Sequence, residues 1–422
     1  MSTEWSASGL EALRLRLVRS KAETAALPDD EQLLVEPFSP IFVYPIFGDE
    51  ETIFGYQSLE IDYRFASGSL NQYLSISFDA KFPEQGDVKA DDPEKTLYEF
   101  IPPSYSKNLE AFEATVEKDA REFKPLGTRV GAYRTRSAGA GADKGKGKGK
   151  GKGRSEPGPV LPEREWEPVE DPEQDDDDEV RYEAYWANWD TPGFKEYHRR
   201  MQIFVLLYIE GASYIDEEDG RWEFVTLFER RKTDGVTSFH FMGFVSFYSF
   251  FCWPDTKRLR LAQFVLLPIY QGHGHGTALY TTCYRNILSR KEISELTVED
   301  PSEAFEDMRD KCDLFTLVSE NALAGLKAPL DREWTESVRK KYKLADRQFY
   351  RLVEMLLLLT SDPNDAPQQR LIRLGVKKRL YLFNKEQLLQ IEDKDERKAK
   401  LQETFVGVQD DYRRLTYKFS AA

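Results

Sequence analysis

One short stretch of this chain indicates its fold: Gln271-Gly272-His273-Gly274-His275-Gly276. It stands between the apolar run Phe264–Leu267 and a segment with helical periodicity over Thr277–Leu288. A strand, a glycine turn and a helix start in this order form a site for phosphate. The glycines let the backbone approach an anion without a side-chain clash, and the free N–H groups of the helix start point at that anion. Glu299 and Asp300 follow at the end of the next apolar run.

The composition indicates a folded, acidic protein with more than one domain. The 422 residues suffice for two or three domains, and 40% of them are hydrophobic, which can supply real cores. The net charge is -15 and the isoelectric point is about 5.0. Nucleic acid backbones repel a uniformly acidic protein, so we expect no direct nucleic-acid partner. A basic partner fits the charge better.

Cysteine usage and apolar runs indicate the compartment. The three cysteines form no CxxC pair, which argues against a disulfide framework or a zinc site and for a reducing compartment. Residues Met1–Leu27 mix Glu and Arg with apolar residues, so we expect no signal peptide. The longest apolar run, Met355–Leu359 with its neighbours, is too short to span a bilayer. We therefore expect a soluble, intracellular protein with no membrane partner.

Shifts in composition divide the chain into five segments. A Gly/Ala/Lys stretch over Ala138–Arg154 and an acidic run over Asp175–Glu179 cannot bury a core, so they predict a disordered insertion. The predicted segments are a flexible lead-in over 1–36 with a short helix around Leu10–Val18, a mixed α/β domain over 37–136, the insertion over 137–181, a central α/β domain over 182–328, and a helical domain over 329–422.

Periodicity predicts the elements that surround the glycine turn. An Asp234-Gly235 turn between two aromatic-rich runs is a strong hairpin signal. Strands are expected at Ile41–Tyr44, Ile53–Tyr56, Leu74–Phe78, Arg221–Glu229, Thr237–Phe251, Leu261–Leu267 and Glu295–Glu299. Helices are expected at Asn108–Phe123, Phe194–Ile209, Thr277–Leu288 and Ser302–Leu314.

The glycine turn itself leaves several interpretations open. A P-loop needs Gly-Lys-Ser/Thr, but Gly276 is followed by Thr277-Ala278. A dinucleotide fingerprint needs other glycine spacings, although Glu299 lies at about the right distance. The acyl-CoA turn of the N-acetyltransferase superfamily, Gln/Arg-x-x-Gly-x-Gly/Ala after a strand, is matched at each fixed position. An ordinary glycine turn is the remaining alternative.

The histidines of the turn favour packing over metal binding. His273 and His275 are two residues apart, the other two histidines lie elsewhere, and no cysteine is near. We expect no metal.

Three carboxylates are candidates for proton transfer, each with a structural alternative. Asp300 could cap the next helix with Pro301 in its first turn, and Glu299 could be a solvated strand end. Alternatively, a carboxylate beside a thioester, partly desolvated so that its pKa rises, could accept the proton that an attacking ammonium must lose. Glu210 is either a helix-end surface group or a second acid.

Together these stretches resemble one family, the catalytic subunit of type B histone acetyltransferases, which belongs to the GNAT superfamily. The resemblance is carried by Phe47–Tyr56, Ile209–Asp216, Arg221-Trp222, Tyr248–Asp255, Gln271–Gly276 and Thr297–Phe305. It covers residues 38–320 apart from the insertion and is looser over 331–418. It implies an α+β or α/β fold, in which a GNAT acetyltransferase core over 182–328 follows a mixed N-terminal domain and precedes a helical C-terminal domain.

The resemblance also implies roles for individual residues. Glu299 matches the general base, and Glu210 and Asp300 match its acidic companions. The positions that match the acetyl-CoA site are Phe264, Val265, Leu266, Gln271, Gly272, His273, Gly274, His275, Gly276, Thr277 and, less closely, Ser302 and Lys311. Those that match the histone-tail groove are Asp49, Glu50, Glu51, Trp222, Tyr248, Ser249 and Phe250. Carboxylates and aromatic rings suit a lysine-rich tail.

The implied activity is acetyl transfer from acetyl-CoA to tail lysines of free, newly synthesised histone H-4. Transfer would be direct, in a ternary complex, with strand N–H groups at Phe264–Leu266 meeting the oxyanion. The resemblance further implies a WD-repeat histone chaperone as partner, a nuclear and cytoplasmic location, and roles in chromatin assembly, silencing and DNA repair. The alternatives are a non-catalytic histone-binding module and a GNAT enzyme acting on another amine.

Overall fold

The computed structural model describes residues 5–84, 86–136, 161–169 and 180–419. The insertion expected over 137–181, with its glycine–lysine repeats and acidic run, therefore falls mostly outside the described residues. The described chain divides into two compact units. Unit 1 comprises the described parts of Met1–Arg136, Glu165–Phe250 and Arg260–Cys283, and unit 2 those of Ser137–Arg164, Phe251–Leu259 and Tyr284–Ala422.

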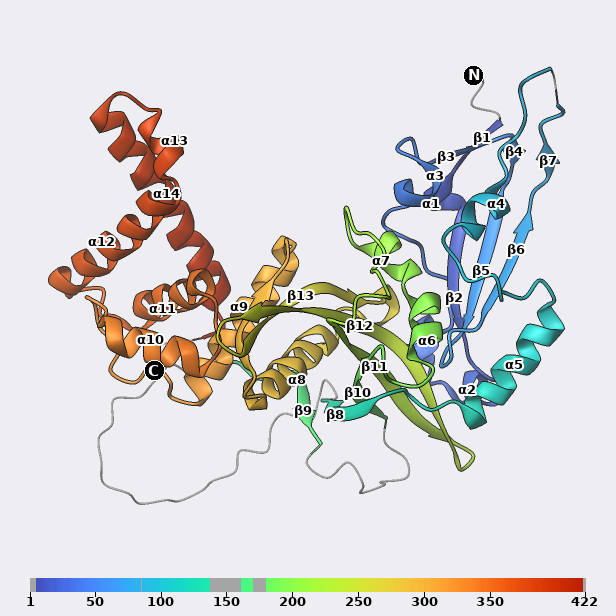
Figure 1. Cartoon of the computed structure of the whole chain (residues 1–422), viewed down its shortest axis with the longest axis horizontal. Helices are drawn as coiled ribbons and strands as arrows, with labels where there is room; N and C mark the ends of the chain where they lie inside the picture. Colours follow the sequence, from blue (N-terminus) through green and yellow to red (C-terminus); the bar gives the residue numbers. More distant parts are fainter. Residues whose placement is uncertain (1–4, 85, 137–160, 170–179, 420–422) are drawn as a thin grey trace. The chain divides into compact units, whose positions relative to one another are not determined.

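Unit 1 begins with short elements that build a small sheet and its covering helix (Figure 1). They are β1 (Ser6–Ser8), α1 (Gly9–Ala12), β2 (Leu13–Val18), α2 (Lys21–Ala26), the 3-10 helix η2 (Asp29–Leu34), α3 (Tyr44–Phe47), β3 (Thr52–Phe54), β4 (Tyr56–Gln57), β5 (Glu60–Ala66), β6 (Gln72–Ser77), β7 (Ala80–Lys81), α4 (Pro93–Tyr98) and α5 (Leu109–Glu122). Strands β2, β5 and β6 form a three-stranded sheet. Phe112 and Val116 of α5 pack on its Ala66 and Tyr73.

The larger sheet has seven strands in the order β14-β13-β12-β11-β10-β8-β9. The elements concerned are β8 (Thr128–Thr135), β9 (Trp166–Pro168), β10 (Arg181–Asn188), α6 (Phe194–Met201), α7 (Ile203–Tyr208), β11 (Trp222–Thr233), β12 (Val236–Cys252), β13 (Thr256–Leu266), the 3-10 helix η3 (Pro268–Tyr270), α8 (His275–Ser289) and β14 (Ile293–Val298). Strand β13 begins in unit 2 and ends in unit 1.

The rest of unit 2 is helical (Figure 1, orange to red). Its helices are α9 (Glu303–Ser319), α10 (Arg332–Lys341), α11 (Asp346–Thr360), α12 (Ala366–Phe383), α13 (Lys385–Leu389) and α14 (Lys394–Thr416). Met355, Tyr412 and Leu415 form a buried cluster that joins α11 to α14. The predicted fold class, mixed α and β with a helical C-terminal region, is confirmed. No helix of the described ranges is long and apolar enough to cross a membrane.

The helix predicted around Leu10–Val18 is wrong beyond Ala12, where α1 ends, and this lead-in segment is folded. Residues Leu13–Val18 form β2, which pairs in parallel with β5, and its leucines are at most 1% exposed. The alternation Leu-Arg-Leu-Arg-Leu has the period of a strand rather than a helix. Arg19 then donates to the Glu229 carboxylate of β11 across 2.7 Å, and both side chains are 1% exposed. This buried ion pair fixes the N-terminal segment to the large sheet.

Two further expectations are corrected. The strand expected at Ile41–Tyr44 is absent: residues 41–43 are irregular, and Tyr44 opens the short helix α3, with Pro45 in its first turn. Trp166, which the disordered insertion was expected to include, is 3% exposed and pairs with Thr135 of β8 in the strand β9. By contrast, the Asp234-Gly235 hairpin and the helix over Asn108–Phe123 are confirmed.

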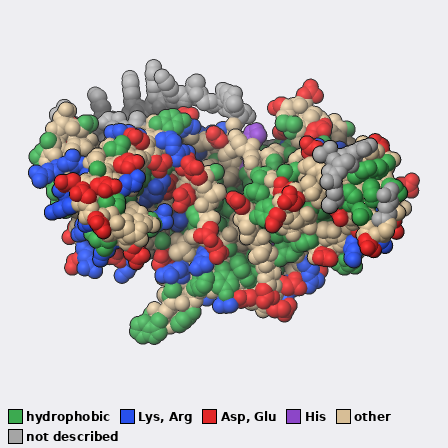
Figure 2. Space-filling model, turned by 90° about the horizontal axis from the view of Figure 1, so that it is seen from above, with side chains coloured by type: hydrophobic (Ala, Val, Ile, Leu, Met, Phe, Trp, Pro, Cys, Tyr) green, Lys and Arg blue, Asp and Glu red, His purple; other side chains and the backbone are tan. Residues whose placement is uncertain are grey.

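On one face of the molecule, acidic and basic side chains are mixed. The sequence holds 74 acidic and 59 basic residues, but on the face in Figure 2 the two kinds are interspersed, and Lys and Arg gather over the helical part at left. On this face, attraction of a basic partner would come from local acidic groups rather than from a uniformly acidic surface.

Candidate functional site

The glycine turn of unit 1 is shaped to receive an anion. Gly272 and Gly274 have φ angles of 82° and 79°, a region that side-chain-bearing residues rarely adopt. Around Gly272 there is open space, whereas a Cβ on Gly274 would meet the side chain of Glu165 at 3.0 Å. Helix α8 begins at His275, and the first N–H groups of a helix have no partner within it. A pyrophosphate fits a cradle of this kind.

Side chains on both sides of the turn hold its backbone. Gln271 donates to the carbonyl oxygen of Leu266 across 2.7 Å, and the Thr277 hydroxyl donates to the carbonyl oxygen of Gly274 across 2.7 Å. The indole N–H of Trp166 in turn donates to the Thr277 hydroxyl across 3.0 Å. Trp166 is therefore a supporting residue that the sequence interpretation missed, because the insertion around it hid its burial.

His275 is a packing residue of this turn. It is 4% exposed, its Nδ1 lies 2.9 Å from the Tyr133 hydroxyl, and its ring contacts that of Tyr182 at 4.3 Å between centroids. Burial, together with the charge of His273, lowers the pKa of His275 to about 4, so the ring is neutral at physiological pH. His273 is exposed. In the part of the chain that the structure describes, no cluster of three or more His, Cys, Asp or Glu side chains could hold a metal ion.

Strand β13 presents alternate faces at the predicted acetyl-CoA positions. The side chains of Phe264 and Leu266 are half-buried on one face, and that of Val265 is buried on the other. Val265 can therefore reach a ligand on the open face only through its backbone. Gly243 of β12 makes this arrangement possible, because a Cβ there would lie 2.1 Å from the Val265 carbonyl oxygen. No sequence motif marked Gly243.

The predicted groove residues of β11 and β12 fall on opposite faces of the sheet. Trp222 pairs directly with Tyr248, their ring centroids are 4.8 Å apart, and Phe250 lies 4.8 Å from Tyr248 on the same side. Ser249 is buried on the other side, where its hydroxyl donates to Glu223 across 3.4 Å. The period of two along a strand explains this division. The aromatic surface is thus Trp222, Tyr248 and Phe250, without Ser249.

A carboxylate and a guanidinium complete this aromatic surface. Asp219 accepts hydrogen bonds from Arg221 at 2.6 and 2.8 Å and from the Tyr248 hydroxyl at 3.0 Å. The Arg221 guanidinium stands over the Tyr248 ring, 4.6 Å from its centroid. The hydrogen bonds from Arg221 are the main reason that the pKa of Asp219 lies well below its ordinary value. Neither Asp219 nor Arg221 was singled out for a site role in the sequence.

The predicted acidic loop and Glu210 come together around α3. Asp49 and Glu50 are exposed, whereas one oxygen of Glu51 accepts from the backbone N–H groups of Val43 and Tyr44 at 3.0 and 3.1 Å. The backbone N–H of Gly211, next to the exposed Glu210, donates to the Tyr44 hydroxyl across 2.7 Å. Glu51 therefore holds the start of α3, and Asp49, Glu50 and Glu210 keep exposed carboxylates.

The remaining predicted site residues belong to unit 2. Glu299 and Asp300 follow β14 and are exposed. The alternative that Asp300 caps the next helix is wrong: Ser302 is the N-cap of α9, its hydroxyl accepting from the Phe305 N–H at 3.3 Å. Asp300 instead has a φ of 31°. Lys311 is exposed on α9.

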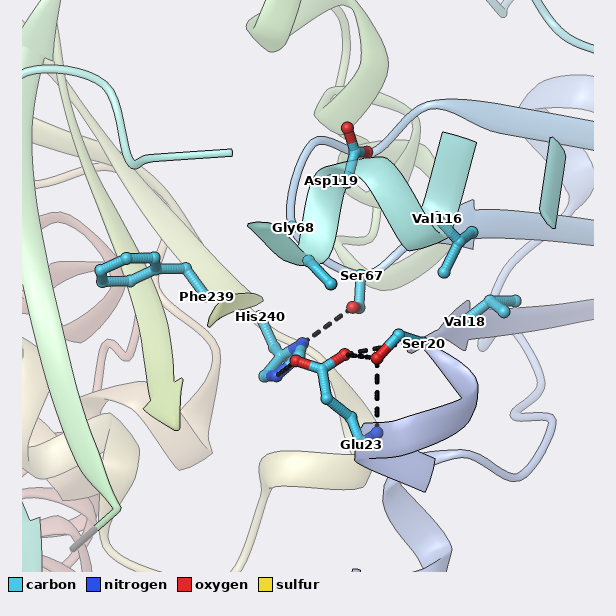
Figure 3. A pocket seen from close by; sticks show the side chains of 10 residues that line it. Val18, Ser20, Glu23, Ser67, Gly68, Val116, Asp119, Phe239 and His240 are labelled. Carbon is cyan, nitrogen blue, oxygen red and sulfur yellow. Dashed lines mark hydrogen bonds and ion pairs between the residues drawn. The ribbon is translucent and has the colours of Figure 1, made fainter. Parts of the chain in front are cut away.

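A small pocket of unit 1 holds a serine, a histidine and a carboxylate in series (Figure 3). The Ser67 hydroxyl lies 2.8 Å from His240 Nδ1, and His240 Nε2 lies 3.4 Å from Glu23. This is the order of a nucleophilic triad, but Ser67 is only 6% exposed and its backbone is hydrogen-bonded to Val18 and Phe241. Burial, with Arg19 nearby, lowers the pKa of His240. We interpret the series as a structural link between α2 and β12.

Comparison with known proteins identifies the family of this chain. The family model described as the N-terminus of the histone acetyl transferase HAT1 matches residues 5–210, and that of the C-terminal part of fungal HAT1 matches residues 310–362. The chain is similar to three proteins named histone acetyltransferase type B catalytic subunit. It is 46% identical to that of Cryptococcus neoformans var. neoformans serotype D, over 98% of this chain and 97% of that protein. It is 42% identical to that of Mycosarcoma maydis, over 98% and 88%, and 32% identical to that of Rattus norvegicus, over 87% and 78%. The chain therefore belongs to the family of type B histone acetyltransferase catalytic subunits and is a histone acetyltransferase.

Proposed function

We propose that this enzyme transfers an acetyl group from acetyl-CoA directly to tail lysines of free, newly synthesised histone H-4. In this proposal Glu299 is the general base, and Glu210 and Asp300 are its acidic companions. Membership of the family supports the reaction class. We infer the identity of the histone, the direct mode of transfer and the roles of these residues from the sequence motifs and the local geometry.

The observation that carries the proposal is the turn Gln271–Thr277. Two left-handed glycines and the N–H groups at the start of α8 make a cradle for the pyrophosphate of acetyl-CoA. The half-buried face of β13 with Phe264 and Leu266, and the backbone of Val265, would hold the part of the cofactor that carries the acetyl group. Ser302 and Lys311 are assigned to the same cofactor. Since the Ser302 hydroxyl caps α9, we assign it only a secondary contribution to acetyl-CoA binding.

The aromatic surface and the acidic loop suit a lysine-rich tail. The rings of Trp222, Tyr248 and Phe250 lie on one side of the sheet and can cover aliphatic lysine stems. The exposed carboxylates of Asp49 and Glu50 can pair with ammonium groups. We assign Glu51 and Ser249 to the same substrate region as supporting residues, because their side chains are bonded to neighbouring protein groups.

The acceptor lysine must lose a proton before its nitrogen can attack. A carboxylate within hydrogen-bond reach can take that proton directly or through a water molecule. Glu299 is exposed, so its carboxylate is accessible to a bound substrate or to a bridging water molecule. The nitrogen forms the new amide bond as the thioester bond breaks, and the second proton that the nitrogen loses goes to the sulfur, which leaves as the thiol of CoA.

We further propose a WD-repeat histone chaperone as partner, a location in nucleus and cytoplasm, and roles in chromatin assembly, silencing and DNA repair. These rest on the resemblance of the motifs alone. Co-purification of the full chain with that chaperone, compared with an unrelated WD-repeat protein as control, tests the partnership. Equal recovery of both would contradict it.

The role of Glu299 is tested by Glu299→Gln, which keeps the shape and removes the charge. We expect turnover on a histone H-4 tail peptide to fall by about 10²- to 10⁴-fold. Thermal stabilisation by acetyl-CoA should be retained, because the cofactor still binds the folded state. Glu303→Gln, an equal charge change at an exposed position in the first turn of α9, is the matched control. Near-normal turnover of Glu299→Gln would remove Glu299 from this role.

A further inference from the structure

A positive side chain of the protein itself occupies the aromatic surface of unit 1. Arg221 precedes the first residue of β11, and its guanidinium stands 4.6 Å from the centroid of the Tyr248 ring. The Asp219 carboxylate holds that guanidinium through two hydrogen bonds and also accepts from the Tyr248 hydroxyl. Trp222 packs edge-on against the same ring. One carboxylate and one aromatic ring, the latter backed by Trp222, therefore contact one cation.

This arrangement is a general binding site for a basic side chain. A cation is attracted to the face of an aromatic ring, and an adjacent carboxylate adds charge-assisted hydrogen bonds. Neighbouring groups hold Asp219 in place, because its carboxylate accepts from the backbone N–H of Arg221 and its carbonyl oxygen accepts from the indole N–H of Trp189 at 3.0 Å. The site is therefore built into the loop that leads to β11, and Arg221 is the part of it that can move.

We infer that Arg221 is an internal placeholder, and that a lysine or arginine side chain of the histone tail displaces it from Tyr248 and Asp219. The inference rests on the proposed function, in which Trp222 and Tyr248 receive the tail, and it adds Asp219 as a specificity-determining residue. It assigns this subsite to a basic residue that flanks the acetylated lysine, because the subsite binds a positive charge and the acceptor lysine must lose its own.

Displacing Arg221 from Asp219 costs little free energy, because the Arg221 side chain is exposed. The Arg221 side chain is 60% exposed and that of Asp219 is 22% exposed. An exposed ion pair contributes little to stability because water and salt screen it. The displaced Arg221 side chain can be solvated by water. The incoming cation then makes the same contacts with the Asp219 carboxylate and the Tyr248 ring.

The test measures binding of fluorescein-labelled histone tail peptides to the full chain by fluorescence anisotropy at fixed ionic strength. Arg221→Ala removes the competing cation, so we expect the Kd of the peptide to fall by about 2- to 5-fold. Any loss of one positive charge also favours a basic peptide in general. Arg199→Ala controls for this, since Arg199 is 47% exposed and pairs with Glu217 rather than with Asp219.

A second substitution tests the carboxylate. In the Arg221→Ala background, Asp219→Asn should raise the Kd by about 2- to 5-fold, because only the substrate then uses that group. When Arg221 is present, Asp219→Asn alone should change the Kd less. The substitution then weakens the binding of the competing Arg221 side chain as well as the binding of the peptide, and the two effects partly cancel. The effect of Asp219→Asn on the Kd should therefore depend on whether Arg221 is present. A merely structural role of Asp219 would not produce this coupling between the two substitutions.

Three results would overturn the inference. These are weaker peptide binding in Arg221→Ala, a gain no larger than that of Arg199→Ala, and an unchanged Kd on adding Asp219→Asn to Arg221→Ala. Tail peptides of each core histone are compared in parallel. A failure of the H-4 peptide alone would contradict the proposed substrate, while the order of the variants on the peptide that binds still decides the role of Arg221.

Discussion

The turn that opens α8 makes a quantitative prediction for Gly274→Ala. Gly274 has a φ of 79°, where an alanine is disfavoured by about 1–2 kcal/mol, and the new Cβ would also meet the Glu165 side chain at 3.0 Å. We expect the turn to relax away from the left-handed region and to re-aim its N–H groups. Loss of one hydrogen bond to a charged group costs about 1.5–3 kcal/mol. The Kd for acetyl-CoA should therefore rise by about 10- to 100-fold.

Isothermal titration of acetyl-CoA into each variant measures this effect. Gly235→Ala is the matched control: Gly235 has a φ of 77°, a Cβ there meets nothing within 4 Å, and it lies in the turn between β11 and β12. Gly272→Ala, at a φ of 82° in open space, adds backbone strain to the anion turn without a clash. All three should lower the melting temperature, but only the changes at Gly272 and Gly274 should weaken acetyl-CoA binding. Unchanged binding in both would refute the cradle.

Two further predictions concern stability, measured by urea unfolding. Arg19→Ala leaves Glu229 buried without its principal partner and should cost about 3–5 kcal/mol, whereas Arg199→Ala in an exposed pair should cost less than about 1 kcal/mol; equal losses would contradict the anchoring of the N-terminal segment. Burial lowers the pKa of His198 to about 3 and that of His275 to about 4, from 6.5. The unfolded chain then binds more protons between pH 6.5 and 4, so the free energy of unfolding should fall as pH is lowered through this window. A constant value from pH 7.5 to 5 would mean that these histidines are not buried as described.

The sequence predicted the elements whose signals are local. The Asp234-Gly235 pair requires a tight hairpin, and β11 and β12 pair on either side of it. The glycine pattern after an apolar run predicted the turn and the helix α8 that follows it. Asn108 caps α5 at the predicted start. In each case the residues that specify the structure are close in sequence.

The parts that the sequence missed depend on partners distant in the chain. β2 is held by β5 and by the buried pair between Arg19 and Glu229, and neither partner is marked by a motif near β2. Trp166 supports Thr277 from a segment whose composition hid it. Gly243 is required only because β13 passes close to it. Contacts of this kind follow from tertiary packing, which overrides local propensity.

The candidate site was predictable in kind but not in detail. The motifs named Trp222 and Tyr248, but only the strand register shows that Ser249 faces away from them. The motif Arg221-Trp222 carried the resemblance but gave Arg221 no role, and Asp219 lay outside every motif; their pairing beside Tyr248 is visible only in the structure. Both residues contact Tyr248, which the pairing of β12 with β11 brings beside them.

We propose that this chain acetylates lysines of free histone H-4 with Glu299 as the base. Mass spectrometry of purified histone H-4 after incubation with acetyl-CoA and the full chain tests it most directly, with Glu299→Gln and Glu303→Gln in parallel. We expect acetylated tail lysines with the unmodified chain and with Glu303→Gln, and almost none with Glu299→Gln over the same time. Absence of acetylation by the unmodified chain, or equal acetylation by Glu299→Gln, would contradict it.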